Sequence, residues 1–413
     1  MSNLNKDSIV ILLLCSDLAL DRSNKLSSKP FTTLQWQKLS ERIINSDIES
    51  PAELLDISKE DLVNTLHLEN DDVERIYSLM SRKVNMAIEI ENLSSKGINI
   101  TTRAEKDYPA KLKKVLKKKC PPVLYFAGDI SLCNLLAMAV VGSRNVDEEG
   151  ADFTKRLSEK CVDSSLIIVS GGAKGVDSIA ETTAMNSGGK AISIVSDSLE
   201  KKVKLKNNRK AIIDGKLLMM SAVNPKATFK GFNAMDRNKY VYAMSDFATV
   251  ISSDYNKGGT WNGAVENLKN MWVPLLVRSG ADIPFGNEEL INKGSVKITN
   301  KQLSATFNFK EWLKDNKKPA NKGVVKQLSF YDSTNGNKAE KAVDLYELIK
   351  TEVVDFFVFE NTVRFASEAF NIMEPQMMIW VEKAVEQGLL DKVGNSDKYI
   401  KLMESNDKEE FSH

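Results

Sequence analysis

Between Ala139 and Asp177 a short apolar segment runs twice into a glycine loop and then into a helical segment. The first loop is Gly142-Ser143-Arg144, and the second runs from Ser170 to Gly175, just before Asp177 in the next helix. Strands that are apolar throughout are typical of parallel sheets, because helices cover both faces of such a sheet. Two consecutive strand–loop–helix units therefore constrain this part of the chain to an α/β fold.

The two glycine loops have the composition of phosphate-binding loops. Glycine lets backbone N–H groups approach an anion closely, and the first turn of the following helix adds unpaired donors. Each loop also carries a cationic side chain, and two such loops favour an anion site where one alone is most often a plain turn. The residues predicted to contact phosphate or another part of a nucleic acid here are Gly142, Ser143, Arg144, Ser170, Gly171, Gly172, Lys174, Gly175 and Asp177.

Short apolar strands alternate with amphipathic helices up to about residue 300. This pattern predicts a doubly wound, Rossmann-like parallel sheet, in which ligands bind outside the carboxyl ends of the strands. Neither loop matches the dinucleotide fingerprint, and Lys174 is not followed by Ser or Thr as in a Walker A loop. The predicted strands are Val123–Phe126, Met138–Val141, Leu166–Val169, Ala191–Val195, Leu217–Met220, Ala248–Ile251 and Val273–Val277.

A third glycine loop follows the strand that ends at Ile251 and precedes a helix that begins near Ala264. Its placement repeats that of the first two loops, so we expect it at the same edge of the sheet. Three such loops with nearby cations are hard to explain by packing alone. The residues predicted to bind phosphate in this loop are Lys257, Gly258, Gly259 and Thr260.

Two further segments are rich in lysine. Segment 201–210 follows the strand that ends at Val195, so it should lie on the same edge as the glycine loops. That placement favours phosphate contact by Lys202, with a solvated loop as the alternative. Segment 111–119 is more typical of a solvated helix face, because lysine is common on protein surfaces.

Polar residues beside the loops have roles that the sequence leaves open. Asp177 could cap its helix, hold Lys174 or contact a ribose, and capping is the commonest of these roles at a helix start. Arg237 and Asn238 lie near Phe229 and other aromatic residues. This composition suits single-stranded nucleic acid, where guanidinium groups pair with phosphates and rings stack on bases. The alternative is a structural arginine at a helix end.

The regions on either side of the core have other patterns. Residues 1–105 predict short helices, as in a SAM-like or helix-hairpin-helix module, or a purely structural helical cap. The core is expected over residues 106–302 and a poorly ordered linker over 303–338. Residues 339–403 predict three helices and a β-hairpin, the outline of a winged helix, followed by an acidic tail over 404–413.

Composition excludes several classes of protein. A net charge of +1 over 413 residues excludes a cationic coat, so a nucleic-acid site must be local. Four scattered cysteines and two histidines indicate a cytoplasmic protein without disulfides or a zinc site. The apolar run Ile9–Cys15 is too short to span a membrane and predicts a buried first helix. No catalytic set of residues is apparent, and we expect neither enzymatic activity nor a cofactor.

The core resembles the DNA-processing protein A (DprA/Smf) family over about residues 105–300. Beyond the glycine loops, it departs from the family at Ser221-Ala222, Val250–Ser253 and Trp261-Asn262, so it is identified as a divergent member. The matching sites, in the order of the family, are Tyr108-Pro109, Leu124-Tyr125, Val141–Arg144, Ser170–Asp177, Gly188-Gly189, Arg237-Asn238, Gly258–Ala264, Pro274 and Gly286–Gly294.

The resemblance implies a core that binds single-stranded DNA, protects it and loads a RecA-type recombinase during DNA uptake in competence, commonly as a homodimer. By resemblance, Arg144, Lys174 and Arg237 are the cations that contact phosphate, and the glycines of the first two loops form the backbone cradle. A role in recombination or in defence against foreign DNA fits the same core. The alternative from another class is a Rossmann-like sensor or hydrolase of a nucleotide-derived small molecule.

Overall fold

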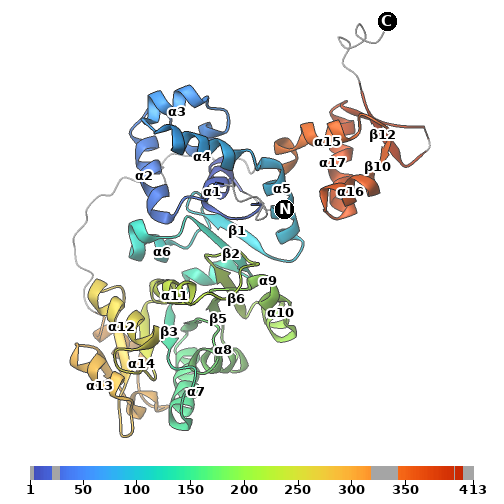
Figure 1. Cartoon of the computed structure of the whole chain (residues 1–413). Helices are drawn as coiled ribbons and strands as arrows, with labels where there is room; N and C mark the ends of the chain where they lie inside the picture. The colour runs from blue at the N-terminus through green and yellow to red at the C-terminus, as the bar shows by residue number, and fades with distance from the viewer. Residues whose placement is uncertain (1–3, 21–27, 318–342, 395, 403–413) are drawn as a thin grey trace, which may run out of the picture. The chain divides into compact units, whose positions relative to one another are not determined.

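The computed structural model describes residues 4–20, 28–317, 343–394 and 396–402 (Figure 1). Tertiary contacts divide the chain into two compact units. The first combines residues 1–31, 40–99 and 335–413, and the second combines residues 32–39 with 100–334. The acidic tail and most of the expected linker lie outside the described residues.

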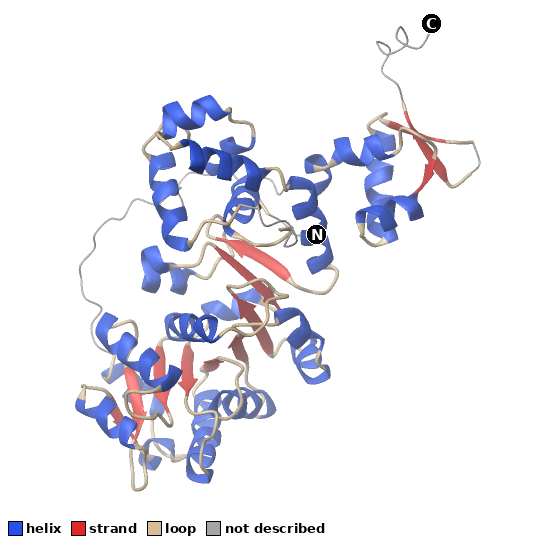
Figure 2. Cartoon of the chain, viewed as in Figure 1, coloured by secondary structure: helices blue, strands red, loops and turns tan. Residues whose placement is uncertain are grey.

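A sheet flanked by helices forms the centre of the second unit (Figure 2). It has nine strands in the order β1-β2-β6-β5-β4-β3-β7-β8-β9. Every neighbouring pair from β6 to β9 in this order is parallel, and β2 pairs with β6 antiparallel. The fold is therefore α/β with a large, mostly parallel sheet, as expected. The strands are β1 (Asn99–Thr102), β2 (Val123–Ala127), β3 (Ala137–Val141), β4 (Ile167–Ser170), β5 (Ala191–Ile194), β6 (Leu217–Ser221), β7 (Phe247–Val250), β8 (Leu275–Arg278) and β9 (Val296–Ile298).

Helices connect the parallel strands. From β3 to β6 successive strands are added on one side of β3, and from β7 to β9 on the other. Right-handed crossovers therefore place α7 to α10 on one face of the sheet and α11 to α13 on the opposite face. The helices of this unit are α6 (Ala110–Leu116), α7 (Glu148–Asp163), α8 (Val176–Asn186), α9 (Leu199–Lys204), α10 (Lys206–Ile213), α11 (Gly231–Ala243), α12 (Gly258–Asn270), α13 (Phe285–Asn292) and α14 (Phe309–Asp315).

The structure differs from the predicted linker at the linker's N-terminal end. Helix α14 lies inside the range 303–338, and its Phe309 and Leu313 side chains are buried. The Lys160 ammonium also donates to the carbonyl of Ser304 at 2.7 Å, which ties this segment to α7. Packed apolar side chains therefore extend this unit at least to Asp315.

The lysine-rich segment 111–119 divides into two kinds of residue. Lys111 belongs to the fold, because its ammonium donates to the Leu135 carbonyl at 2.5 Å and to the Asp246 carboxylate at 2.7 Å. Lys114 and Lys117 are exposed, as a solvated helix face requires.

The N-terminal part of the first unit is helical. Its first helix is buried on all sides from Ile9 to Leu14, as its composition predicts. The buried Arg82 guanidinium donates to the carbonyls of Leu13 and Leu18, which satisfies groups at the end of that helix. The elements are α1 (Lys6–Cys15), α2 (Thr33–Ile44, shared with the second unit), η1 (Pro51–Leu55), α3 (Lys59–Leu66), α4 (Asn70–Met80) and α5 (Lys83–Ser94).

The C-terminal part of the first unit consists of short helices and a small sheet. Its core is formed by Trp380, Tyr346 and Phe357, and β11 and β12 form the antiparallel hairpin that the sequence predicts. The N–H of Val343 donates to the Leu4 carbonyl at 2.8 Å, so the N-terminal and C-terminal parts of this unit are in contact. The elements are η5 (Leu345–Leu348), α15 (Lys350–Phe356), β10 (Asn361–Thr362), α16 (Val363–Phe370), α17 (Glu374–Glu386), β11 (Leu390–Lys392) and β12 (Lys398–Lys401).

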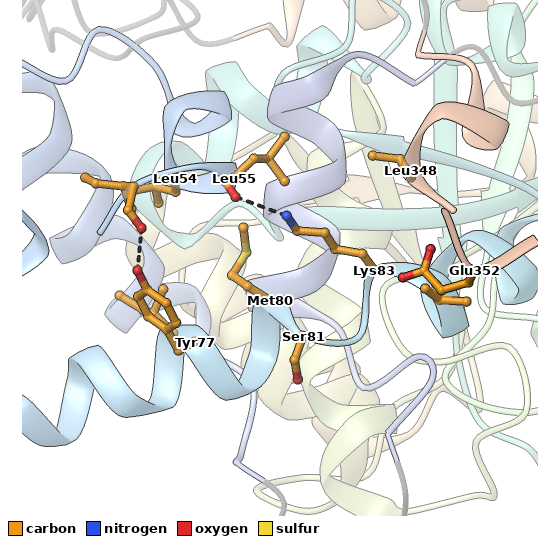
Figure 3. Close-up of a pocket in the computed structure, with 11 residues that line it drawn as sticks. Leu54, Leu55, Tyr77, Met80, Ser81, Lys83, Leu348 and Glu352 are labelled. Carbon is orange, nitrogen blue, oxygen red and sulfur yellow. Dashed lines mark hydrogen bonds between the residues drawn. The ribbon is translucent and has the colours of Figure 1, made fainter. Parts of the chain in front are cut away.

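A pocket of about 340 Å³ lies within the first unit (Figure 3). Apolar side chains dominate its wall, and Lys83 crosses it to donate to the Leu55 carbonyl at 3.0 Å. The lining residues are Leu54, Leu55, Ile57, Ile76, Tyr77, Met80, Ser81, Lys83, Val84, Leu348 and Glu352. Across the described ranges, no helix is both long enough and apolar enough to cross a bilayer.

Candidate nucleic-acid interface

The three glycine loops meet at the carboxyl edge of the sheet. Strands β3 and β7 are parallel neighbours with Val141 opposite Val250, so the loops that follow them emerge side by side. The Ser143 N–H donates to the Ser252 carbonyl at 3.0 Å, and the Val176 N–H donates to the Ser143 carbonyl at 3.3 Å. The structure thus joins the first loop both to the loop after β7 and to the start of α8.

Close backbone packing explains the glycines of the first two loops. A Cβ at Gly175 would lie 2.4 Å from the Ser143 carbonyl oxygen, and its φ of +80° also favours glycine. A Cβ at Gly142 would lie 2.6 Å from a Val176 methyl group. The first loop therefore packs directly on the start of α8, and backbone atoms of the two loops form one continuous surface.

Arg237 lies beneath the second loop rather than on the surface. It is 9% exposed, and its Nη1 is 3.9 Å from the Asp177 Oδ2. Its guanidinium occupies the space where a Cβ of Gly171 would be, 1.4 Å from that ideal position. Burial lowers the pKa of Arg237, and the Asp177 carboxylate opposes this effect. Direct phosphate contact by Arg237, as the sequence suggested, does not fit this burial, and the side chain instead supports the loop.

The Asp177 side chain lies between α11 and the backbone of the second loop. Its buried carboxyl turns toward Arg237 and toward the backbone of Gly171 and Ala173. Burial raises its pKa, while the Arg237 charge and these hydrogen bonds act in the opposite direction. Asp177 and Arg237 therefore form a buried ion pair between α8 and α11.

Glu181 is a member of the site that the sequence analysis missed. Its Oε1 accepts a hydrogen bond from the Gly172 N–H at 3.0 Å. Burial, together with the neighbouring Asp177 charge, raises its pKa to about 8. The sequence does contain a signal for Glu181. Residues four apart on a helix share a face, so Glu181 is predicted to lie on the same face as Asp177.

Asn238 positions the third loop. Its Nδ2 donates to the Gly259 carbonyl at 3.0 Å, and Gly263 packs against the Tyr242 ring, where a Cβ would lie 3.1 Å from Cε2. Helix α12 begins at Gly258, with Thr260 in its first turn and Lys257 exposed just before it. Like Arg237, Asn238 thus connects α11 to a glycine loop.

Exposed cations surround the joined loops. Arg144, Lys174 and Lys257 are all exposed and come from three different loops. Lys202 is half-buried, and its ammonium lies 2.8 Å from the Asp197 carboxylate, so it is less available than the sequence suggested.

Two exposed aromatic side chains extend this surface. The Arg144 guanidinium carbon is 5.6 Å from the ring centre of Phe229, which is 54% exposed. Phe232 is 67% exposed and borders a groove of about 560 Å³ between α11 and α12. The groove is lined by Phe232, Asn233, Met235, Asp236, Asn238, Asn262, Gly263 and Glu266.

The arrangement provides backbone N–H groups, cations and aromatic faces along one edge. It suits a ligand with several phosphates and planar groups, because each kind of contact is present more than once. Within the part of the chain that the structure describes, no three His, Cys, Asp or Glu side chains cluster as metal ligands would.

Comparison with known proteins identifies the same region. Residues 99–307, just over half of the chain, match the family model described as DNA recombination-mediator protein A. The DNA processing protein DprA of Streptococcus pneumoniae is 27% identical over 194 residues, which cover 46% of this chain and 68% of that protein. The protein Smf of Borreliella burgdorferi is 26% identical over 271 residues, which cover 60% and 82% respectively.

Two solved structures are similar to this chain. The X-ray structure of DprA from Streptococcus pneumoniae aligns with a TM-score of 0.49 at 21% identity and covers 68% of this chain and 99% of that one. DNA processing protein A from Helicobacter pylori, whose structure describes a single-stranded DNA binding mode, aligns with a TM-score of 0.44 at 27% identity. That alignment covers 53% of this chain and 97% of the other.

Substitution of Gly171 should disrupt the packing beneath the second loop. In Gly171→Ala the new methyl group must displace the buried Arg237 guanidinium from Asp177, and we expect the free energy of unfolding to fall by about 2–4 kcal/mol. In the control Gly231→Ala the methyl group meets open space at a helix start, so stability should stay within about 1 kcal/mol. Chemical denaturation of both variants measures the difference, and equal stability would contradict this account.

Glu181 should make stability depend on pH. The carboxyl ionises near 4.5 in the unfolded chain and near 8 in the folded one, so the folded chain holds an extra proton between these values. The free energy of unfolding should therefore fall as pH rises from about 5 to 8. Glu181→Gln keeps the oxygen that accepts from Gly172 and removes this slope.

Urea denaturation at pH 6 and at pH 8.5 measures the effect. The wild type should lose about 1–3 kcal/mol more than Glu181→Gln between the two pH values. Parallel losses in the two proteins would show that Glu181 ionises normally.

Proposed function

The chain belongs to the DNA recombination-mediator protein A family, and we propose that it binds single-stranded DNA along the carboxyl edge of its sheet. The observation that carries the proposal is that three glycine loops, each with its own exposed cation, follow the neighbouring parallel strands β4, β3 and β7 at the carboxyl edge of the sheet. Cations spread over several loops suit a polyanion that follows a groove, whereas a single phosphate needs only one loop.

The aromatic side chains favour a single strand over a duplex. Phe229 and Phe232 are exposed beside the cations Arg144 and Lys230, whose charged groups lie 5.6 and 5.9 Å from the respective ring centres. Unpaired bases can stack on such rings, while the bases of a duplex are already stacked on each other. We assign Phe229 and Phe232 to base stacking and the exposed cations to phosphate contact.

Arg237, Asn238, Asp177 and Glu181 have an indirect role in this proposal. They hold the second and third loops from beneath, through Gly171, Gly172 and Gly259. Backbone N–H groups then face the ligand from loops with fixed positions.

The biological role follows from the family. Relatives named as DNA processing proteins support a role in DNA processing or recombination, which includes DNA uptake and defence against foreign DNA. A RecA-type recombinase and a second copy of this chain are the partners that such a role implies. We propose no cofactor and no catalysis for this function.

The flanking regions fit small modules. The short N-terminal helices α1 to α5 suit a SAM-like or helix-hairpin-helix module. At the C-terminus, three helices followed by the hairpin β11–β12 suit a winged helix.

One observation favours a second candidate function. Asp177 and Glu181 form a buried carboxyl pair whose members differ in their surroundings, and such pairs serve as acid and base in hydrolases. A nucleotide-derived small molecule would then be the ligand, sensed or hydrolysed. Both carboxyls lie beneath the second loop, so the surface above them favours the DNA proposal.

Salt titration tests the DNA proposal. Binding of labelled oligo-dT should weaken steeply with salt, because several phosphates release counterions. Arg144→Ala and Lys174→Ala should each weaken binding about 3–10-fold and reduce the salt slope by about 1. The control Lys190→Ala, at the amino end of β5, should change neither quantity. If a mononucleotide binds as tightly as oligo-dT and the affinity depends only weakly on salt, the result supports the small-molecule function and refutes the DNA proposal.

Loss of the aromatic rings should act differently from loss of charge. Phe229→Ala and Phe232→Ala should each weaken oligo-dT binding about tenfold, since stacking contributes about 1–3 kcal/mol per base. The salt slope should stay constant, because no phosphate contact is removed. Met271→Ala removes an equally exposed apolar side chain before β8 and serves as the control. Unchanged affinity in both phenylalanine variants would exclude stacking on these rings.

A further inference from the structure

The C-terminal region, residues 343–402, has a surface that suits protein better than nucleic acid. We propose that this region docks a positively charged, amphipathic segment of a partner protein on an exposed aromatic patch. The proposal is independent of DNA binding at the sheet edge, because it concerns other residues in the other unit.

The charge of the region opposes nucleic acid. Residues 343–402 contain eleven Asp and Glu against six Lys and Arg, a net charge of −5. Five of the six cations lie in ion pairs within the region, which lowers the charge available to phosphate still further. These pairs are Lys350–Glu347, Arg364–Glu368, Lys383–Asp344, Lys398–Glu360 and Lys401–Asp355.

Helix α17 carries the same sign of charge. It is the third helix of the region, which in DNA-reading winged helices enters the major groove. Its exposed charged side chains are Glu374, Glu382 and Glu386, and its one cation, Lys383, pairs with Asp344. A duplex presents a phosphate charge about every 1.7 Å of its axis, so it would repel this helix.

An aromatic patch provides an anchor point for a protein. The Phe356 ring lies 5.8 Å from that of Phe365 and 5.6 Å from that of Phe370, which joins the end of α15 to α16. Phe365 of α16 is 55% exposed, and Phe359, in the loop between α15 and β10, is 79% exposed. We call Phe356, Phe359, Phe365 and Phe370 the aromatic patch. Large exposed aromatic side chains mark interaction sites and often dominate binding energy.

Charge complementarity defines the occupant. The net negative charge of the region attracts lysine and arginine, while the rings take apolar side chains. A segment with both properties is a basic amphipathic helix, which lays its apolar face on such surfaces. A strongly acidic or purely polar segment would not bind.

The test uses the full-length chain and two synthetic probes. One is a fluorescent amphipathic Leu/Lys helix of about 18 residues, and the other is a Leu/Glu helix of the same pattern. Fluorescence anisotropy should show binding of the Leu/Lys probe only. Phe359→Ser/Phe365→Ser should weaken that binding about tenfold or more. The control Phe232→Ser, which changes an exposed phenylalanine of the other unit, should leave it unchanged.

A second variant guards against a folding defect in the first. Glu382→Lys/Glu386→Lys changes only exposed charges of α17 and should also weaken binding of the Leu/Lys probe. Equal binding of the two probes, or no effect of either double variant, would overturn the proposal. Weaker oligonucleotide binding by the Lys392→Ala/Lys398→Ala variant would also overturn it, because the region would then bind nucleic acid. Light scattering tests a second copy of this chain as the occupant. If the Leu/Lys probe does not bind the wild type and the phenylalanine variant has a lower molar mass than the wild type, a second copy occupies the patch and the proposal is overturned.

Discussion

The buried Arg237–Asp177 pair is the interaction on which the candidate interface depends. Helices α8 and α11 cover opposite faces of the sheet, and this pair joins them at its carboxyl edge. The guanidinium can reach Asp177 only because Gly171 has no side chain. A buried charge that loses its partner costs about 3–5 kcal/mol, so the glycine, the aspartate and the arginine act as one unit. Sequence positions 66 residues apart are thereby fixed together beneath the second loop.

Sheet topology determines what lies above this pair. Because β3 and β7 are neighbours in the sheet although three strands separate them along the chain, their loops emerge together. Hydrogen bonds from Ser143 and Val176 then join the loops to each other. The exposed cations are consequently arranged by the backbone, while buried polar side chains support the loops from below.

Much of the architecture could be predicted from the sequence, because buried parallel strands are short apolar runs. All seven predicted strands are present, with ends shifted by at most two residues. The edge strands β1 and β9 were missed, since they are brief and partly polar. The position of the three loops was predictable from strand order, but the burial of Arg237 was not. Its environment depends on an α11–α8 contact across the sheet, which no local pattern encodes.

Both ends of the chain build the first unit, and the second unit is inserted between them. The backbone hydrogen bond from Val343 to Leu4 can form only after the whole inserted unit has left the ribosome. The second unit has all of its sheet in residues 99–298 and can fold during synthesis. The contacts of the N-terminal helices with the C-terminal part of the first unit form only after that. Order of synthesis therefore separates completion of the central sheet from completion of the first unit.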